Sequence, residues 1–421
     1  MSQSSRDIAQ ASANHGWRVT FAALGINLAL AIMYSWSVVS KGVPDAWGWS
    51  QAAKSLPFSI SCLVISLVMV PAGRMQDTLG PRLVATIGGI LVGLGMILAS
   101  FTTTPLGYVL GFGVLTGAGI ASAYAAATPP AVKWFPAAKT GMIVGIVVSG
   151  FGLAPVYAAP LTEWLIGRYG LAQAVMVLGV AFLLVVASLA QILKPPPPGY
   201  VPPGTPPQPA SGSTQLKEDY PPWDMLRTWQ FYVLWFMYAC GAGAGLMIIS
   251  KLAGIASDQA GLELGFVLVA VLAVGNGAGR IVAGVASDKI GRKATMQLCF
   301  AMQAVLILLL SQTTEGSLLA STAVLAVVSA LIGANYGANL ALFPSLTKDY
   351  YGLKNFGVNY GLVFTAWGFG GFMLALLAGK VHDETGSFNF AYYCSAALLV
   401  VAAVVTLVVK PPHRVEEEPA T

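Results

Sequence analysis

Long apolar runs alternate with short polar segments over most of the chain. Each run has about 17–25 residues, the length at which an α-helix crosses a bilayer. Gly and Ala crowd these runs and strand-like alternation is missing, which favours packed helices over a β-barrel. The sequence therefore predicts an all-α membrane protein with twelve transmembrane helices. The predicted spans are residues 18–40, 52–72, 83–101, 106–128, 141–162, 171–193, 229–250, 265–286, 295–312, 317–342, 356–379 and 390–409.

A Pro-rich polar tract, KPPPPGYVPPGTPPQPASGSTQLKEDYPPWD, interrupts this pattern between the sixth and seventh spans. Proline at this density does not continue a helix, and it makes a semi-rigid linker. We therefore predict an N-terminal six-helix bundle at residues 1–194, a cytoplasmic linker at 195–228 and a C-terminal six-helix bundle at 229–421.

The two halves repeat a loop motif. GRMQDTLGPR at residues 73–82 joins spans two and three, and GVASDKIGRK at 284–293 joins spans eight and nine. Asp77 corresponds to Asp288 and Gly80 to Gly291, each pair 211 residues apart. A six-plus-six repeat around a linker is typical of transporters that bind their substrate near the bilayer midplane, between the halves.

Composition agrees with a membrane protein. Of 421 residues, 56% are hydrophobic and 9% charged, whereas soluble proteins carry roughly 25% charged residues. The polar N-terminus has no apolar stretch of the kind a cleavable signal peptide needs. If both termini lie on one side, most of the 22 lysines and arginines share that side. The other side has only Lys41, Lys54, Arg168, Lys251 and Lys380.

This bias predicts a multi-pass protein of the cell's inner (plasma) membrane with both termini in the cytoplasm. The net charge of +5 is explained by these basic loops, so no nucleic-acid partner is expected.

Several kinds of chemistry are disfavoured. The four cysteines have no metal-ligand spacing, and the three histidines lie outside the spans. No phosphate-binding Gly-x-x-x-x-Gly-Lys-Ser/Thr motif occurs. The glycines at 111–113 and 275–279 lie within apolar runs with no preceding strand, which favours helix packing over dinucleotide binding. We expect no cofactor, no metal and no enzymatic activity, and therefore no catalytic residue.

Arg280 is the most informative residue because it lies inside an apolar run. At about 1.5 Å per residue it is roughly 12 Å from the charged turn at residues 288–293. A guanidinium near the bilayer centre costs about 2.5–3.5 kcal/mol on insertion scales. Its fork geometry suits a carboxylate ligand, although neutralisation by protein groups is the structural alternative. Asn276, one turn earlier on the same face, either bonds a substituent beside that carboxylate or braces Arg280.

The paired loop motif resembles that of the major facilitator superfamily. Arg280 ahead of SDKIGRK, YSW at residues 34–36 and WFP at 134–136 make the chain similar to the monocarboxylate transporters and the related oxalate–formate antiporters. The resemblance implies a small organic carboxylate as substrate, proton symport and a monomer in the bilayer.

Two departures from these relatives bear on the substrate. Animal monocarboxylate transporters typically have an Asp where this chain has Asn276, so Arg280 lacks a counter-ion in its own helix. Oxalate carriers have a lysine where this chain has Trp367. One buried cation instead of two favours a monocarboxylate over a dicarboxylate.

Further residues are candidates by position. Asn335 and Tyr336 in the tenth span have polar groups that lipid does not satisfy, so they face the bundle interior as ligands or as interhelical contacts. The remaining candidates for the cavity are Leu28, Tyr34, Tyr124, Phe364 and Trp367, for which helix packing is the alternative reading. The family resemblance also implies a gating role at the cytoplasmic side for Asp77, Arg82, Asp288, Arg292 and Lys293.

We therefore predict a secondary transporter of a short monocarboxylate such as lactate or pyruvate, working by alternating access. The first alternative is an exchanger of carboxylates of the oxalate–formate type. The second is a membrane receptor on the same scaffold that transports nothing.

Overall fold

The structure is a computed structural model, described here for residues 3–136, 140–197, 200–202, 219–263, 265–352 and 355–412. The elements before the linker are α1 (Gln3–Leu30), η1 (Ala31–Ser35), α2 (Trp36–Lys41), η2 (Asp45–Trp47), α3 (Gln51–Leu79), α4 (Pro81–Ser100), α5 (Pro105–Tyr108), η3 (Val109–Thr116), α6 (Gly117–Val132), α7 (Thr140–Leu153), α8 (Pro155–Tyr169) and α9 (Leu171–Ala190). Those after it are α10 (Pro222–Leu226), α11 (Trp229–Ala260), α12 (Gly265–Ile290), α13 (Arg292–Ser311), η5 (Leu318–Ala320), α14 (Thr322–Tyr351), α15 (Phe356–Thr385) and α16 (Asn389–Val408).

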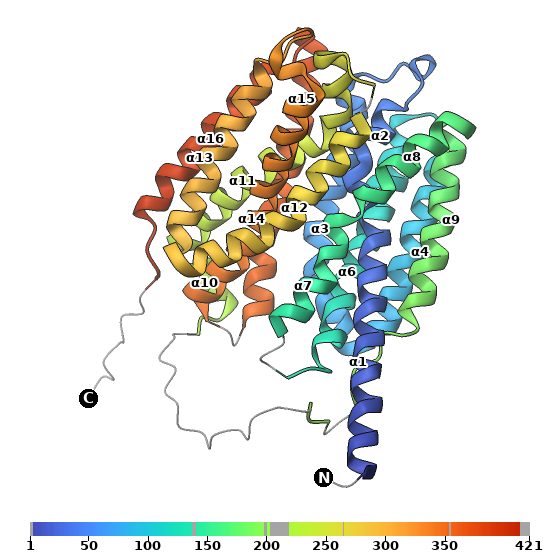
Figure 1. Cartoon of the computed structure of the whole chain (residues 1–421), viewed down its shortest axis with the longest axis vertical. Helices are drawn as coiled ribbons and strands as arrows, with labels where there is room; N and C mark the ends of the chain where they lie inside the picture. Colours follow the sequence, from blue (N-terminus) through green and yellow to red (C-terminus); the bar gives the residue numbers. More distant parts are fainter. Residues whose placement is uncertain are drawn as a thin grey trace.

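The helices form two bundles that lie side by side (Figure 1). Elements α1–α9 make the N-terminal bundle and α11–α16 the C-terminal bundle, with α3 packed against α15 between them. The first helix begins and the last helix ends at the same end of the molecule (Figure 1), which we call the proximal end. The opposite end is the distal end.

The twelve predicted spans are confirmed, since twelve helical segments of the described residues are long and apolar enough to cross a membrane. Several helices extend beyond the predicted spans. Helices α3, α11, α14 and α15 continue to Leu79, Ala260, Tyr351 and Thr385. A helix satisfies its own backbone hydrogen bonds wherever it lies, so it does not have to end where the apolar run ends.

Irregular turns break some spans near their middle. The first span changes from α1 to the 3-10 turn η1 at Ala31–Ser35 and resumes as α2. The fifth span divides into α7 and α8 at Pro155, whose ring removes a backbone donor. A short 3-10 stretch within a helix rotates the side chains that follow it, and here it carries Tyr34.

The repeated loops adopt the same backbone conformation in both halves. Gly80 joins α3 to α4 with φ 86° and ψ 153°, and Gly291 joins α12 to α13 with φ 90° and ψ 151°. A side chain is disfavoured at such positive φ values, so both positions require glycine.

Four glycines bring α12 and α14 into close backbone contact. A Cβ at Gly275 would lie 1.9 Å from the carbonyl oxygen of Ala330, and one at Gly333 would lie 2.0 Å from that of Leu272. Gly279 and Gly337, one turn further along each helix, are equally close to the facing backbone. These glycines therefore pack helices, as predicted for residues 275–279, and they fix the position of Arg280 on α12.

Gly275→Ala should destabilise the protein, because the added methyl group meets backbone that does not move without separating α12 from α14. Overpacking of this kind costs roughly 1–3 kcal/mol. We expect a melting temperature several degrees lower in detergent, measured by thermal unfolding. Gly284→Ala, on the same helix with no atom within 4 Å of the added Cβ, is the matched control and should melt unchanged or slightly higher. Equal melting temperatures for the two variants would contradict the close contact.

Candidate functional site

Arg280 points into a small cavity between the two bundles. The cavity has a volume of about 30 Å³, room for a few water molecules at about 10–15 Å³ each. Its lining is aromatic and aliphatic apart from the guanidinium and the tyrosine hydroxyls. The lining residues are Tyr34, Ile65, Met69, Ile120, Tyr124, Phe151, Arg280, Leu340, Phe364 and Trp367.

The guanidinium of Arg280 has weak partners within the protein. Its Nε donates to Oδ1 of Asn276 at 3.2 Å, and Nη1 donates to the carbonyl oxygen of Val148 at 3.5 Å. Among the described residues, no carboxylate lies within 4.0 Å of it. Arginine has five N–H donors, and only two of them have hydrogen-bond partners in the described part of the chain. The contact with Val148 on α7 also makes Arg280 a link between the two bundles.

Asn276 is fully buried and holds Arg280 in place. Its Oδ1 accepts from Arg280, while its Nδ2 has no hydrogen-bond partner. Close packing against α14 fixes the backbone at position 276. A Cβ added at Gly337 of α14 would lie 2.1 Å from the carbonyl oxygen of Asn276. An unpaired buried amide costs free energy unless a ligand or water satisfies it. The side chain therefore has a donor available beside the guanidinium.

Three buried polar groups connect the bundles next to Arg280. The hydroxyls of Tyr34 and Tyr336 lie 2.7 Å apart, and the indole Nε1 of Trp367 donates to the Tyr336 hydroxyl at 2.8 Å. Tyr34 belongs to the N-terminal bundle, and the other two belong to α14 and α15. This series of hydrogen bonds sets the orientation of the three aromatic rings on one side of the cavity.

Stacked and edge-on rings complete the wall. Phe364 stacks on Trp367 with ring centroids 5.2 Å apart. Phe151 makes edge contacts with Tyr34 at 5.1 Å and with Tyr124 at 5.2 Å. Such pairs are rigid and apolar, and they suit the alkyl part of a small ligand.

The structure thus brings most of the predicted site residues together, but not all line the cavity. Tyr34, Tyr124, Arg280, Phe364 and Trp367 line it. Asn276 and Tyr336 lie directly behind lining residues, to which they are hydrogen-bonded.

Two further predicted site residues, Asn335 and Leu28, neither line the cavity nor hydrogen-bond to a lining residue in the described part of the chain. The carbonyl oxygen of Asn335 accepts from Asn339 at 3.0 Å, and that of Leu28 accepts from Tyr157 at 2.9 Å. The Nδ2 of Asn335 has no hydrogen-bond partner. Their predicted substrate contacts stay predictions.

Five lining residues were not among the predicted ones. Ile65, Met69, Ile120, Phe151 and Leu340 are ordinary apolar residues of membrane helices, and nothing in the sequence distinguishes them from packing residues. Their position follows from the rotation of each helix, which only the tertiary structure defines. In the described part of the chain, no three His, Cys, Asp or Glu side chains gather as a metal site requires.

The candidate gating residues of the first loop make contacts within the N-terminal bundle. Arg82, at the start of α4, donates from Nε and Nη2 to the carbonyl oxygen of Gln191 at 3.1 and 2.7 Å. Asp77 accepts from the side chain of its neighbour Gln76. Arg82 therefore ties the proximal ends of α4 and α9 together.

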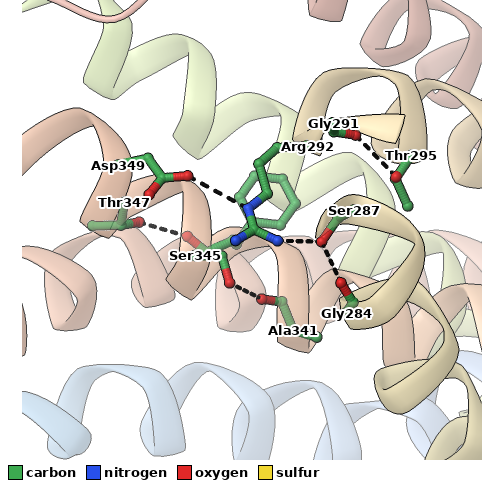
Figure 2. A network of polar contacts seen from close by, with 10 residues as sticks. Gly284, Ser287, Gly291, Arg292, Thr295, Ala341, Ser345, Thr347 and Asp349 are labelled. Atoms are coloured by element: carbon green, nitrogen blue, oxygen red, sulfur yellow. Dashed lines mark hydrogen bonds and ion pairs between the residues drawn. The ribbon is translucent and has the colours of Figure 1, made fainter. Parts of the chain in front are cut away.

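The second loop also has an arginine that makes contacts within its own bundle (Figure 2), one position before Lys293, the residue that corresponds to Arg82. Arg292, at the start of α13, pairs with Asp349 near the end of α14 at 3.4 Å and also donates to Ser287 of α12. Lys293 follows it in the first turn of α13. Asp288 lies on α12, and its side chain is outside the described part of the structure. The gating role of both loops stays a prediction.

The distal ends of the bundles are joined by a polar cluster. Asp383 of α15 accepts from the backbone nitrogens of Gln51 and Ala52, at 2.6 and 2.8 Å, and so caps the first turn of α3. Lys251 of α11 donates to the carbonyl oxygen of Gln51 at 3.2 Å. These contacts border a cavity of about 280 Å³.

Lys251 lies inside a helix, whereas the sequence predicts that the seventh span ends at residue 250. Helix α11 continues to Ala260, and Lys251 is only 5% exposed. Apolar residues continue beyond this lysine at 252–256, but hydropathy alone does not show that neighbouring helices cover it. Arg280 is therefore accompanied by a second enclosed cation, at the distal end.

Comparison with known proteins identifies the relatives of the chain. The family described as "Major Facilitator Superfamily" matches residues 20–272 and 234–421. The oxalate:formate antiporter of Oxalobacter formigenes is 29% identical over 362 residues, covering 84% of this chain and 81% of that protein. Human monocarboxylate transporter 11 is 26% identical, covering 91% of this chain and 80% of that protein.

A solved structure supports the fold. A bacterial homolog of the human lysosomal transporter Spinster, in an inward-facing and occupied conformation, superposes with a TM-score of 0.67 at 15% identity. The match covers 93% of this chain and 96% of that one. At this identity the likeness concerns the fold alone.

Tyr336→Phe should destabilise the protein, because it removes the oxygen that pairs with both Tyr34 and Trp367. Leaving buried donors unpaired costs about 1–3 kcal/mol, so we expect a lower melting temperature in detergent. Tyr350→Phe is the matched control: the Tyr350 hydroxyl on the same helix is buried but has no hydrogen-bond partner. If both variants melt alike, the hydrogen-bonded chain contributes nothing measurable.

Proposed function

The chain belongs to the major facilitator superfamily, and we propose that it carries a short monocarboxylate of the lactate or pyruvate type across the membrane. Its fold and its relatives make it a multi-pass secondary transporter of a small molecule. The observation that supports the choice of substrate is Arg280, a permanent cation that faces the cavity between the bundles without a carboxylate partner among the described residues.

In this proposal, the substrate carboxylate binds the free N–H groups of Arg280. Charge-assisted bonds of about 2.7–2.9 Å to a carboxylate are stronger than the 3.5 Å contact with the Val148 carbonyl, which they replace. Asn276 keeps Nε oriented through its Oδ1 and offers its unpaired Nδ2 to a 2-hydroxyl or 2-oxo oxygen. The rings of Phe364 and Trp367 receive the alkyl end.

The size of the cavity supports a small cargo. At about 30 Å³ it is far below the roughly 300–1,000 Å³ of sites for drug-sized ligands. Even a three-carbon acid requires some movement of the lining aromatic side chains. Substrate binding and rearrangement of the bundles are therefore coupled in this proposal.

In this proposal, alternating access works by breaking and forming contacts between the bundles. The distal cluster of Lys251, Asp383 and Gln51 joins them at the side that we assign to the cell exterior. Access from that side requires these bonds to break while the bundles rock about Arg280. The predicted latch at the cytoplasmic side, with Asp77 and Asp288 in its loops, closes in the opposite state.

Coupling to protons belongs to the same proposal and rests on the family resemblance, with no residue assigned to the proton. The alternative is exchange of two carboxylates, which the similarity to an oxalate:formate antiporter favours. Trp367 at the position of the oxalate carriers' lysine argues for a substrate with a single carboxylate.

Uptake of radiolabelled lactate into proteoliposomes under an imposed pH gradient tests the function. Accumulation driven by the gradient is the expected result. Uptake that depends on preloaded carboxylate instead identifies an exchanger. If no monocarboxylate enters under either condition, the proposal is wrong.

Arg280→Lys keeps the charge but loses the fork that binds a carboxylate with two parallel bonds. We expect uptake at low substrate concentration to fall at least about tenfold, as the loss of a charge-assisted bond of about 1.5–3 kcal/mol implies. Arg168→Lys, an exposed arginine in the last turn of α8, is the matched control and should transport normally. Wild-type uptake by the Arg280→Lys carrier would refute the assigned role.

Asp383→Asn should weaken the distal closure, because a neutral amide caps the α3 N-terminus less strongly than a carboxylate. A negative charge near a helix N-terminus is worth about 0.3–1 kcal/mol, so we expect a roughly two- to fivefold larger population with the distal ends apart. Spin-label distances between the distal ends of α3 and α15 measure this population. Glu384→Gln, at the exposed neighbouring position, is the control and should leave the distances unchanged. Identical distance distributions for both variants would show that Asp383 does not hold the bundles together.

A further inference from the structure

A third cavity, of about 740 Å³, lies at the proximal end on the N-terminal bundle, where α1 passes the end of α9. It is far from the distal cluster and shares no lining residue with the central cavity. Its lining residues are His15, Trp17, Arg18, Phe21, Ala22, Leu189, Gln191, Ile192 and Lys194.

This cavity forms because helix α9 ends before the neighbouring helix α1 does. At Gly25 the helices touch, since a Cβ there would lie 2.6 Å from Cδ1 of Leu189. Helix α9 ends at Ala190, whereas α1 extends further toward the proximal end. The surface of α1 that α9 no longer covers forms one wall, and the chain leaving α9 up to Lys194 forms the other.

The rim of the cavity is basic and lacks an acid. Arg18 and Lys194 are exposed, and among the described residues neither has a carboxylate within 4.0 Å. No Asp or Glu is among the lining residues. The Lys194 backbone is fixed, because its carbonyl oxygen accepts from the Trp134 indole at 2.8 Å. Two positive side chains therefore line the same cavity, and the described residues supply no carboxylate to pair with either of them.

The lining also has an apolar part with exposed side chains. Phe21 is 58% exposed and Ile192 is 39% exposed. Trp17 stacks on Phe21 with ring centroids 5.8 Å apart, at the start of the first span. Tryptophan at this position is typical of the membrane–water interface, which places the basic rim at headgroup level.

We propose that this cavity binds one anionic phospholipid of the cytoplasmic leaflet. Its phosphate lies between Arg18 and Lys194, and an acyl chain follows Phe21 and Ile192 along the groove. Basic pockets beside membrane helices on this side recognise anionic headgroups. A free phosphate would leave the exposed apolar wall unused, so the amphiphile fits the whole cavity better.

Such a lipid would brace the splayed ends of α1 and α9. Helix α1 leads directly into η1, which carries Tyr34 of the central site. Anionic lipid is therefore expected to stabilise the N-terminal bundle whatever the transported substrate is, so this inference does not rest on the proposed function.

Native mass spectrometry of the purified full chain with phosphatidylglycerol or phosphatidylcholine tests the proposal. We expect one retained phosphatidylglycerol on the wild type. Retention by the double variant R18Q/K194Q should be about thirtyfold weaker, since each basic residue near an anionic headgroup strengthens binding roughly fivefold. The matched control, K348Q/K410Q, removes two exposed basic residues from the proximal end of the C-terminal bundle and should retain the lipid.

Thermal unfolding supplies a second readout. Phosphatidylglycerol should raise the melting temperature of the wild type and the control but not of R18Q/K194Q. Should the double variant not fold, Lys194→Gln alone, in an exposed loop, should still weaken retention about fivefold. Equal retention by R18Q/K194Q, equal binding of phosphatidylcholine, or equal stabilisation by inorganic phosphate would each overturn the proposal.

Discussion

The structure depends on the need to accommodate a permanent positive charge inside a membrane bundle. A guanidinium at this depth is costly unless oxygen atoms surround it. The protein supplies the Asn276 amide and a distant carbonyl of Val148, and among the described residues no carboxylate is near. The close glycine contacts between α12 and α14 then prevent the helix from rotating the charge away. The charge is thus held rigidly but incompletely satisfied, which is what binding an anion requires.

Polar contacts join the two bundles at the centre and at the distal end. The distal contacts close that end of the molecule. Around the centre, Tyr34, Tyr336 and Arg280 make single bonds across the interface. At the distal end, Asp383 caps a helix of the opposite bundle, and buried Lys251 supports the same turn. In the described part of the chain, Arg82 and Arg292 instead brace their own bundles at the proximal end. A carrier that rocks about its centre has to exchange the distal contacts between the bundles for a different set.

Much of the fold and part of the candidate site were predictable from the sequence. The reason is that apolar length and isolated charges reflect the energetic constraints that a bilayer imposes. The twelve spans, the packing role of residues 275–279 and the pairing of Asn276 with Arg280 follow from local sequence. The lining by Phe151 and Ile65 was not predictable, because it depends on how each helix is rotated. The enclosure of Lys251 was missed for a related reason, since the residues around it include ones from α2 and α3, far away in sequence.

The central claim is that Arg280 contacts the substrate carboxylate directly. Solid-state NMR measures this contact as a dipolar coupling between carboxyl-¹³C lactate and ¹⁵N-labelled arginine in lipid bilayers. A bidentate pair places the carboxyl carbon within about 4 Å of both Nη atoms, given bonds of about 2.7–2.9 Å. The account predicts a strong coupling that disappears in Arg280→Lys protein. Bound lactate without this coupling would contradict it.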